Sequence, residues 1–258
     1  MWVRTYYMHT YLLFWGTLGL LDRLLVVFLV LTIFGSLIYF AVAGASYYVF
    51  FVWQKARYLP GEGPEPAHIG QAIGLSLVNI LGNALLTSPI YVLIIQGYSR
   101  LYLSVDDYGW AYLLGSALAY LGFTETCVYW IHRLLHRPWF FKALHRYHHQ
   151  FRLPTPWVSM AFHPLDSFAQ AVPNYLCVFL LPIHVGVYTG FIVYVMLWTF
   201  LIHDRVTLFP WRAVNYTAHH TLHHLYNKCN YGQFLTFWDR IAGTYRQPPA
   251  EVHHSVIQ

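Results

Sequence analysis

The sequence is poor in charged residues and in cysteine. Only 10% of its 258 residues are charged, whereas 57% are hydrophobic; an average soluble domain is about 25% charged. A soluble fold of this size could not bury so much apolar surface, which excludes an ordinary soluble domain and favours a bilayer. The three cysteines lie far apart without a C-x-x-C pair, which excludes a disulfide framework and a thiolate metal site. The net charge of +5 is too small and dispersed for nucleic-acid binding and suits a membrane surface.

Long uncharged runs predict membrane-spanning helices. No charged residue lies between Arg23 and Lys55, a run longer than the roughly 20 residues that a helix needs to cross the hydrocarbon core. The run from Leu59 to Pro66 is rich in proline and glycine and predicts a loop. We predict three spans, at about 24–51, 72–96 and 109–131. The third span continues into the first histidine pair.

A further uncharged region, from Ser167 to His203, is slightly too short for two full crossings. Pro182 lies near its middle, so we predict a tight hairpin of two helices that returns to the side from which it came. Pro89 predicts a kink in the second span, which membrane helices tolerate. The expected fold class is an all-α integral membrane protein with four to five transmembrane or hairpin helices.

Basic residues predict the orientation in the membrane. They follow the first span, the third span and the hairpin, whereas the loop at 97–108 holds Arg100 against Asp106 and Asp107. Because short basic flanks stay on the cytoplasmic side, we expect these flanks and the histidine motifs within them to face the cytoplasm. The N-terminus is then expected on the far side.

Histidine is the residue that the sequence has in abundance, and 12 of the 16 histidines lie between His132 and His224. Eight of them form one pair and two triplets: His132 and His136; His145, His148 and His149; His220, His223 and His224. Positions i, i+3 and i+4 share one face of a helix, so each motif is expected to project its imidazoles together. Three such motifs on one predicted side favour metal binding over chance surface histidines.

Eight neutral imidazoles are too many for a single ion, because catalytic zinc uses about three protein ligands. Two metals with four or five nitrogens each fit the number. Imidazole suits iron, zinc and copper alike. We favour iron, because oxygen chemistry on buried lipids is the common reason to hold two redox metals at a membrane.

Three more histidines and one aspartate are candidates. We favour His203 as a ninth ligand, with Asp204 orienting its ring; the alternative is a helix-end histidine that faces lipid headgroups. His163 is either a ligand or supporting residue of the site, or a structural histidine. His219 must point away from its neighbour His220, and either binds metal or forms a hydrogen bond.

Glu125 is the sole carboxylate within the third predicted span. It shares a helical stripe with His132 and His136, and a carboxylate inside a membrane is a functional candidate by default. We favour a role near the site. The alternative is that Glu125 pairs with a polar group of the second span, such as Asn79 or Asn83.

The motifs and the text between them resemble the sterol C-5 desaturase group of the fatty acid hydroxylase and sterol desaturase superfamily, whose members are membrane di-iron enzymes. The resemblance covers about residues 120–247 and is carried in order by YWIHRLLHRPWFFKALHRYHHQF, PTPWVSMAFHPLDSFAQAVP, LPIH, WTFLIHD and AHHTLHHLYNKCNYGQFLTFWDRIAGTYR. It implies that the eight motif histidines, and His203 within IHD, bind the metals. It also implies a helical membrane anchor capped by a cytoplasmic helical dome that holds two irons.

The resemblance implies an oxygen-dependent desaturase that introduces the C-5(6) double bond into a Δ7-sterol. The chain has no nucleotide, flavin or haem motif, so the electrons are expected from NAD(P)H through a reductase and cytochrome b5, or through a ferredoxin in a bacterium. The expected location is the endoplasmic reticulum in a eukaryote or the inner membrane in a bacterium. We expect a single membrane-embedded domain over 1–258, with an anchor at 1–119 and a catalytic region at 120–247.

Two other functions are considered. A lipid hydroxylase or sterol methyl oxidase of the same superfamily would share the histidines and differ in product. A histidine-rich metal transporter is the remote alternative, because it would carry its ligands along the inner faces of several spans, whereas the motifs here lie outside the membrane.

Overall fold

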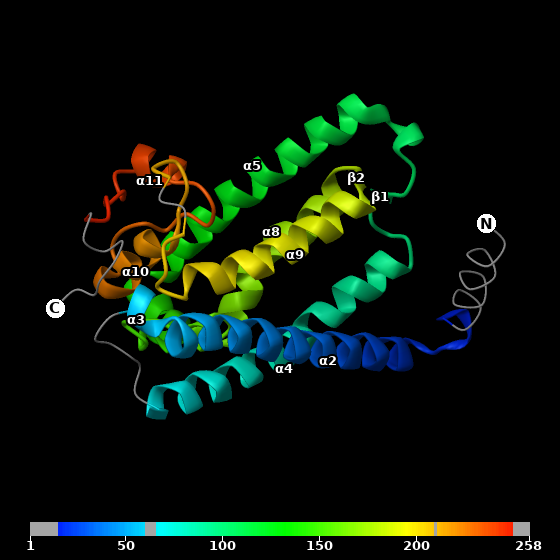
Figure 1. Ribbon diagram of the computed structural model, residues 1–258. Coiled ribbons are helices and arrows are strands. Elements are labelled where there is room, and N and C mark those ends of the chain that lie inside the picture. Colours follow the sequence, from blue (N-terminus) through cyan, green and yellow to red (C-terminus); the bar gives the residue numbers. More distant parts are fainter. Residues whose placement is uncertain (1–14, 60–65, 209–210, 250–258) are drawn as a thin grey trace.

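The computed structural model describes residues 15–59, 66–208 and 211–249. These residues form long helices that run side by side, with shorter helices gathered at one end (Figure 1). The loop predicted at 59–66 falls mostly outside the described residues. An all-α fold is confirmed in these ranges, apart from two short strands.

Three helical segments are long and apolar enough to cross a membrane: Leu20–Trp53, His68–Ile95 and Val185–Ile202. The first comprises α2 (Leu20–Tyr47) and the π-helix η1 (Tyr48–Trp53), and the second lies within α4 (Pro66–Ile95). Large apolar side chains of α2, such as Ile33 and Leu37, remain exposed, as expected of a lipid-facing helix. The first two predicted spans are therefore confirmed, and the chain is an integral membrane protein.

The third predicted span forms α5 (Gly109–Leu135), which continues through His132 as expected. It is not among the three most apolar segments, because buried polar residues such as Thr124 and Glu125 lower its hydropathy. Figure 1 shows α5 running alongside the hairpin. A short strand and turn precede α5: β1 (Leu101–Tyr102) and η2 (Val105–Asp107).

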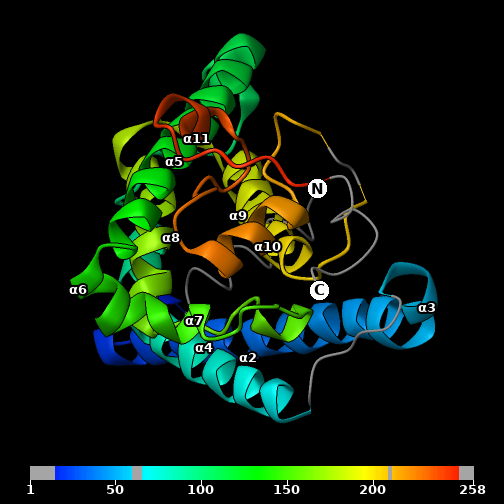
Figure 2. The ribbon, with the colours of Figure 1, turned by 90° about the vertical axis from the view of Figure 1, so that its left-hand side faces the viewer.

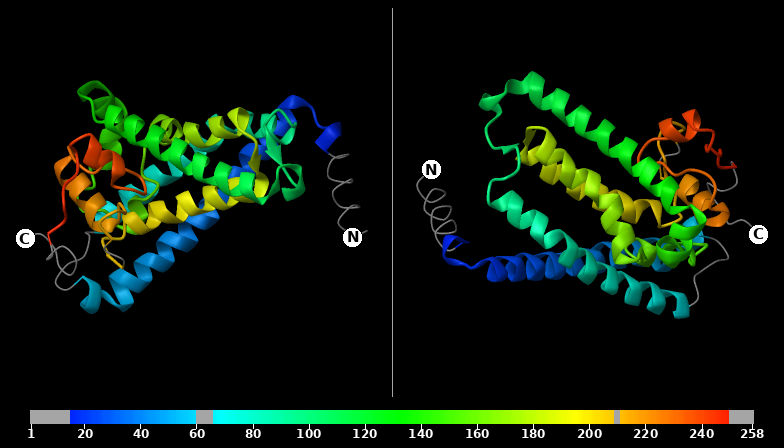
Figure 3. Two further views of the ribbon diagram at one scale, coloured as in Figure 1. Left: turned by 90° about the horizontal axis from the view of Figure 1, so that it is seen from above. Right: turned by 180° about the vertical axis from the view of Figure 1, so that it is seen from behind.

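The predicted hairpin is present. It consists of α8 (Pro164–Leu180), the short strand β2 (Ile183–His184) and α9 (Val185–Ile202), and the chain reverses around Pro182. Strands β1 and β2 pair in parallel, Leu101 with Ile183 and Tyr102 with His184. The tip of the hairpin therefore reaches the loop between α4 and α5, at the end opposite the short helices (Figure 3).

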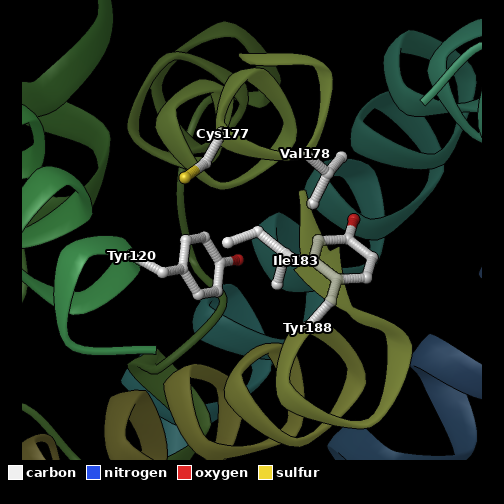
Figure 4. Close-up of a cluster of buried hydrophobic side chains, with 5 residues drawn as sticks. All are labelled: Tyr120, Cys177, Val178, Ile183 and Tyr188. Carbon is white, nitrogen blue, oxygen red and sulfur yellow. The ribbon is translucent and has the colours of Figure 1, made fainter. Parts of the chain in front are cut away.

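Helix α8 is central to the packing, because α4 and α5 both pack against it, while α2 packs against α4. A buried cluster joins α5, α8 and the return of the hairpin (Figure 4): Tyr120, Cys177, Val178, Ile183 and Tyr188. The Tyr120 hydroxyl donates a hydrogen bond to Asn174 Oδ1 at 3.3 Å, which ties α5 to α8 within the cluster.

The short helices form a dome at one end of the bundle, seen end-on in Figure 2. They are α3 (Lys55–Tyr58), α6 (Pro138–Phe140), η3 (Phe141–His145), α7 (Arg146–His149), η4 (Pro156–Val158), α10 (Thr217–Tyr226) and α11 (Phe237–Ile241). Helix α10 is capped at its C-terminal end by Asn227, which takes a left-handed conformation with φ 59° and donates its N–H to the carbonyl oxygen of His223 at 2.8 Å. All three histidine motifs reach this dome.

Candidate metal centre

Nine histidines converge where the dome meets the helical bundle. They form a five-histidine group, His132, His136, His145, His149 and His223, and a four-histidine group, His148, His203, His220 and His224. Within each group one ring nitrogen of every member lies within 4.8 Å of the others. These are the eight motif histidines and His203, so the structure brings together every residue that the sequence analysis favoured as a ligand.

Each triplet contributes to both groups. His145 and His149 belong to the five-histidine group, whereas His148, between them, belongs to the other. The α10 triplet divides in the opposite sense, with His223 alone in the five-histidine group. Positions i and i+4 thus share a metal group and position i+3 is directed to the neighbouring one, which corrects the expectation that each motif projects all its imidazoles together.

Backbone carbonyls fix the orientation of four of these rings. Nδ1 donates to a carbonyl oxygen in four cases: His132 to Tyr231 at 2.9 Å, His203 to Thr199 at 2.6 Å, His223 to Cys229 at 2.8 Å and His224 to Phe151 at 3.0 Å. A carbonyl can only accept, so Nδ1 carries the proton and Nε2 is left with a free lone pair for a metal. Because any residue type can supply a carbonyl, these partners could not be predicted from the sequence.

A buried carboxylate that was not predicted from the sequence fixes the fifth ring. His145 Nδ1 lies 2.7 Å from Asp166 Oδ2, and both residues are fully buried. Gln170 donates to the other carboxylate oxygen at 2.8 Å. One signal was available: Asp166 is the sole acidic residue between Glu125 and Asp204. A carboxylate on the far nitrogen of a ligating histidine raises its basicity toward a metal.

The Nε2 atoms face one another at short range. His223 Nε2 lies 3.0 Å from His149 Nε2 and 3.2 Å from His136 Nε2, and His203 Nε2 lies 3.0 Å from His220 Nε2. Burial, followed by the neighbouring imidazoles, lowers the pKa of His149 and His223, which favours neutral rings with lone pairs. Converging lone pairs repel unless a cation lies between them, so both groups fit metal ions.

The other candidates lie outside the two groups. His163 caps α8, accepting the Leu165 N–H at 3.2 Å. His219 is fully buried, with Nε2 3.3 Å from the Tyr245 hydroxyl. Asp204 accepts the Val206 N–H at 2.9 Å and does not orient His203, whose ring is held by its own helix; this corrects the predicted Asp204 contact.

Glu125 binds the loop that follows α10. Its carboxylate accepts the N–H of Phe234 at 3.1 Å and of Leu235 at 2.8 Å. The suggested partners in the second span are wrong: Asn79 donates to the Met160 carbonyl and Asn83 to the Ser167 hydroxyl. The same loop contains the carbonyls of Cys229 and Tyr231, which hold the rings of His223 and His132. Glu125 is therefore connected to the histidines through this loop.

A cavity of about 330 Å³ borders the metal groups and extends between the long helices. At one end it is lined by His132, His148, His203 and His220, and farther along by apolar residues of α2, α4 and α9 that include Leu31, Ile80 and Met196. Three of these four histidines belong to the four-histidine group, so that group is the more open to a ligand in the cavity. The shape suits a mostly apolar molecule with its reacting part beside the histidines.

Comparisons with known proteins agree with this architecture. The fatty acid hydroxylase family model matches residues 117–244. The Delta(7)-sterol 5(6)-desaturase of Schizosaccharomyces pombe is 40% identical over 94% of this chain and 75% of its own length. The lathosterol oxidase of Mus musculus is 36% identical over 85% of this chain and 75% of its own length. No solved structure matches the chain. With relatives this similar along most of its length, the chain belongs to the fatty acid hydroxylase family.

Proposed function

We propose that the chain is an oxidoreductase that introduces the C-5(6) double bond into a Δ7-sterol, using dioxygen, during sterol biosynthesis. The observation that carries this proposal is the apolar cavity that ends at the two histidine groups. The relatives support the substrate class, because desaturases of Δ7-sterols and a lathosterol oxidase match most of the chain at 36–40% identity.

Two iron ions are proposed as the metals, one in each histidine group. Bound there, they would supply the activation of dioxygen that removes the hydrogens from C-5 and C-6. The protein's own part is orientation: backbone carbonyls and Asp166 fix the ligating rings. The apolar cavity walls exclude water and hold a flat hydrocarbon beside the histidines.

The electrons are proposed to come from an external protein, cytochrome b5 with its reductase or a ferredoxin. Basic residues around the dome would attract an acidic donor: Arg133, Arg137, Lys142, Arg146 and Arg152. We place the dome on the cytoplasmic side, at the endoplasmic reticulum in a eukaryote or the inner membrane in a bacterium. The region at 1–119 serves as an anchor for the catalytic region at 120–247, and its helices α2 and α4 also line the cavity.

The test is expression of the full chain in a yeast that lacks sterol C-5 desaturase, with the sterols identified by mass spectrometry. Restored C-5(6)-unsaturated sterols would support the proposal. Accumulation of a hydroxylated sterol or loss of a methyl group would instead indicate a hydroxylase or methyl oxidase. Unchanged sterols with well-expressed, metal-loaded protein would overturn the assignment.

The two-metal arrangement is tested by removing one ligand from each group. His148→Ala and His223→Ala are each expected to abolish turnover while the protein still inserts in the membrane. Metal content should fall from about two equivalents in the parent to about one in each variant. His68, exposed near the start of α4, provides the control, because His68→Ala should keep both metals.

A further inference from the structure

The loop from Cys229 to Thr236 is held rigidly by two buried carboxylates. Asp239 accepts the N–H of Tyr231 and of Gly232, both at 2.8 Å. Glu125 accepts the next N–H groups along, those of Phe234 and Leu235. Four hydrogen bonds to carboxyl groups of two elements leave this segment little freedom.

Gln233 lies between the two carboxylate contacts. Its carbonyl oxygen accepts the indole N–H of Trp198, on α9, at 2.8 Å. Gly232 permits the tight turn from Gly232 to Leu235, because a Cβ at Gly232 would collide with the carbonyl oxygen of Leu235. The backbone of Gln233 is therefore fixed on both sides, so its side chain is presented from a defined position.

Gln233 lines the cavity and follows Tyr231 by two residues, and the Tyr231 carbonyl holds the ring of His132 at 2.9 Å. Gly232 and Gln233 line the cavity together with His132 and His148. Within the part of the chain that the structure describes, Gln233 Oε1 is buried and has no hydrogen-bond partner. The hydroxyl of Ser159, which also lines the cavity and is fully buried, lacks a partner among the same residues.

Unpaired buried polar atoms are unfavourable and uncommon in folded proteins, so two beside one cavity indicate a polar group of the ligand. Two other polar residues that line the cavity, Asn83 and Thr87, are already paired. Asn83 donates to the Ser167 hydroxyl at 2.8 Å, and the Thr87 hydroxyl donates to the Asn83 carbonyl at 2.7 Å. Gln233 Oε1 and the Ser159 hydroxyl therefore have free hydrogen-bonding capacity that a ligand in the cavity could use.

This position matches the chemistry of a sterol, and the inference rests on the proposed function. A sterol carries its hydroxyl at C-3, which a single carbon separates from C-5. When C-5 and C-6 lie beside the histidines, the hydroxyl must therefore lie at the same end of the cavity. We propose that Gln233, assisted by Ser159, binds the substrate hydroxyl and so sets which carbons face the metal groups.

The test compares a Δ7-sterol with its 3-deoxy analogue, in membranes that contain the full-length enzyme and its electron donors. The parent enzyme should prefer the hydroxylated substrate by about tenfold or more in kcat/KM, the value of one well-placed hydrogen bond. Gln233→Met keeps the length of the side chain and removes its amide. It should lose most of this preference through a higher KM for the hydroxylated substrate, with turnover of the 3-deoxy analogue unchanged.

Thr87→Val is the matched control, because Thr87 lines the same cavity with its hydroxyl already bonded; its preference should equal that of the parent. A parent-like preference in Gln233→Met, or no preference in the parent enzyme, would overturn the inference. Should Gln233→Met lose its metals, Gln233→Asn, which shortens the amide by one methylene, must show a reduced preference; a parent-like ratio would again overturn it. Formation of the C-5(6) double bond by the parent enzyme reports separately on the proposed function.

Discussion

The two histidine groups differ in what holds their rings. In the five-histidine group, a carboxylate, Asp166, accepts the Nδ1 proton of His145. In the four-histidine group, carbonyl oxygens hold His203 and His224, and His148 is flanked by Phe162, whose ring stacks on it at 3.8 Å between centroids. A carboxylate makes an imidazole a stronger donor than a carbonyl does. The groups are therefore expected to differ in metal affinity.

Asp166→Asn tests this difference. The amide keeps the size of the side chain and removes the charge, so we expect metal affinity and activity to fall by about 10- to 100-fold, as is typical when the partner of a ligating histidine is lost. Chelator titration should remove the metal of the five-histidine group first. Asp107→Asn, at an exposed residue of η2, should behave as the parent. Unchanged metal retention and turnover in Asp166→Asn would contradict the proposed role.

At the residue scale, the sequence predicted the ligating histidines better than the groups that hydrogen-bond to them. Spacing identified the eight motif histidines, because one helical turn places i and i+4 together. Spacing could not show that His148 and His149 belong to different histidine groups, because this assignment depends on how α7 packs against α10. The Tyr231 and Cys229 carbonyls were beyond prediction, because side-chain identity carries no information about a backbone oxygen.

The contact between α5 and the loop after α10 depends on the single carboxylate of Glu125. This carboxylate joins α5 to the loop after α10 through the N–H groups of Phe234 and Leu235. Glu125→Leu leaves these donors buried and unpaired, so we expect a loss of stability of about 2–4 kcal/mol and weaker metal binding at His132 and His223. Glu125→Gln keeps one acceptor and should lose less.

Thermal unfolding in detergent, together with metal analysis, measures both effects. Ser116→Ala is the control on the same helix, because the buried Ser116 hydroxyl donates to the Leu113 carbonyl of its own helix. Its unfolding temperature should change little. Equal stability of Glu125→Leu and the parent would mean that the loop is held without this contact.

The contact between α4 and α8 depends on the absence of a side chain at Gly82. A Cβ there would lie 2.5 Å from Cγ of Pro164, and a proline ring has no rotamer by which to retreat. Gly82→Ala should therefore push the helices apart and destabilise the protein by about 1–3 kcal/mol. Gly74→Ala, on the same helix with nothing within 4 Å, should be neutral or stabilising. Similar unfolding temperatures for the two variants would argue against this close packing.

The long helices were predictable because a lipid environment permits few backbone conformations. An apolar run in lipid must form a helix so that its backbone hydrogen bonds are made. The apolar runs of the sequence therefore predicted the positions of α2, α4 and the α8–α9 hairpin. The pairing of β1 with β2 was not predicted, since two-residue strands have no periodicity to detect. The partner of Glu125 was misassigned because helical periodicity reports the face of a residue but not which distant loop covers it.

The histidine groups bring together segments from most of the molecule. They connect the end of α5, the segment from η3 to α7, the end of α9 and α10, segments far apart in the sequence. Bound metals would act as cross-links between them, and a ligand that binds the folded state alone at 1,000 times its Kd contributes about 4 kcal/mol. The dome is therefore expected to be the part of the molecule most sensitive to metal.

Removal of both metals by a chelator should lower the unfolding temperature by roughly 15–30 °C, because two ions at about 4 kcal/mol each contribute about 8 kcal/mol and each kcal/mol corresponds to roughly 2–4 °C for a protein of this size. The converging Nε2 lone pairs of His149 and His223 would repel without a cation, so α10 should separate first. Limited proteolysis is expected to cut near α10 before the α8–α9 hairpin, whose buried cluster around Tyr120 and Ile183 is independent of the metals. Re-addition of Fe²⁺ should restore both resistance and unfolding temperature. A double variant, His148→Ala with His223→Ala, should resemble the chelated protein and not respond to chelator; an equal response in this variant and the parent would show that the chelator acts elsewhere.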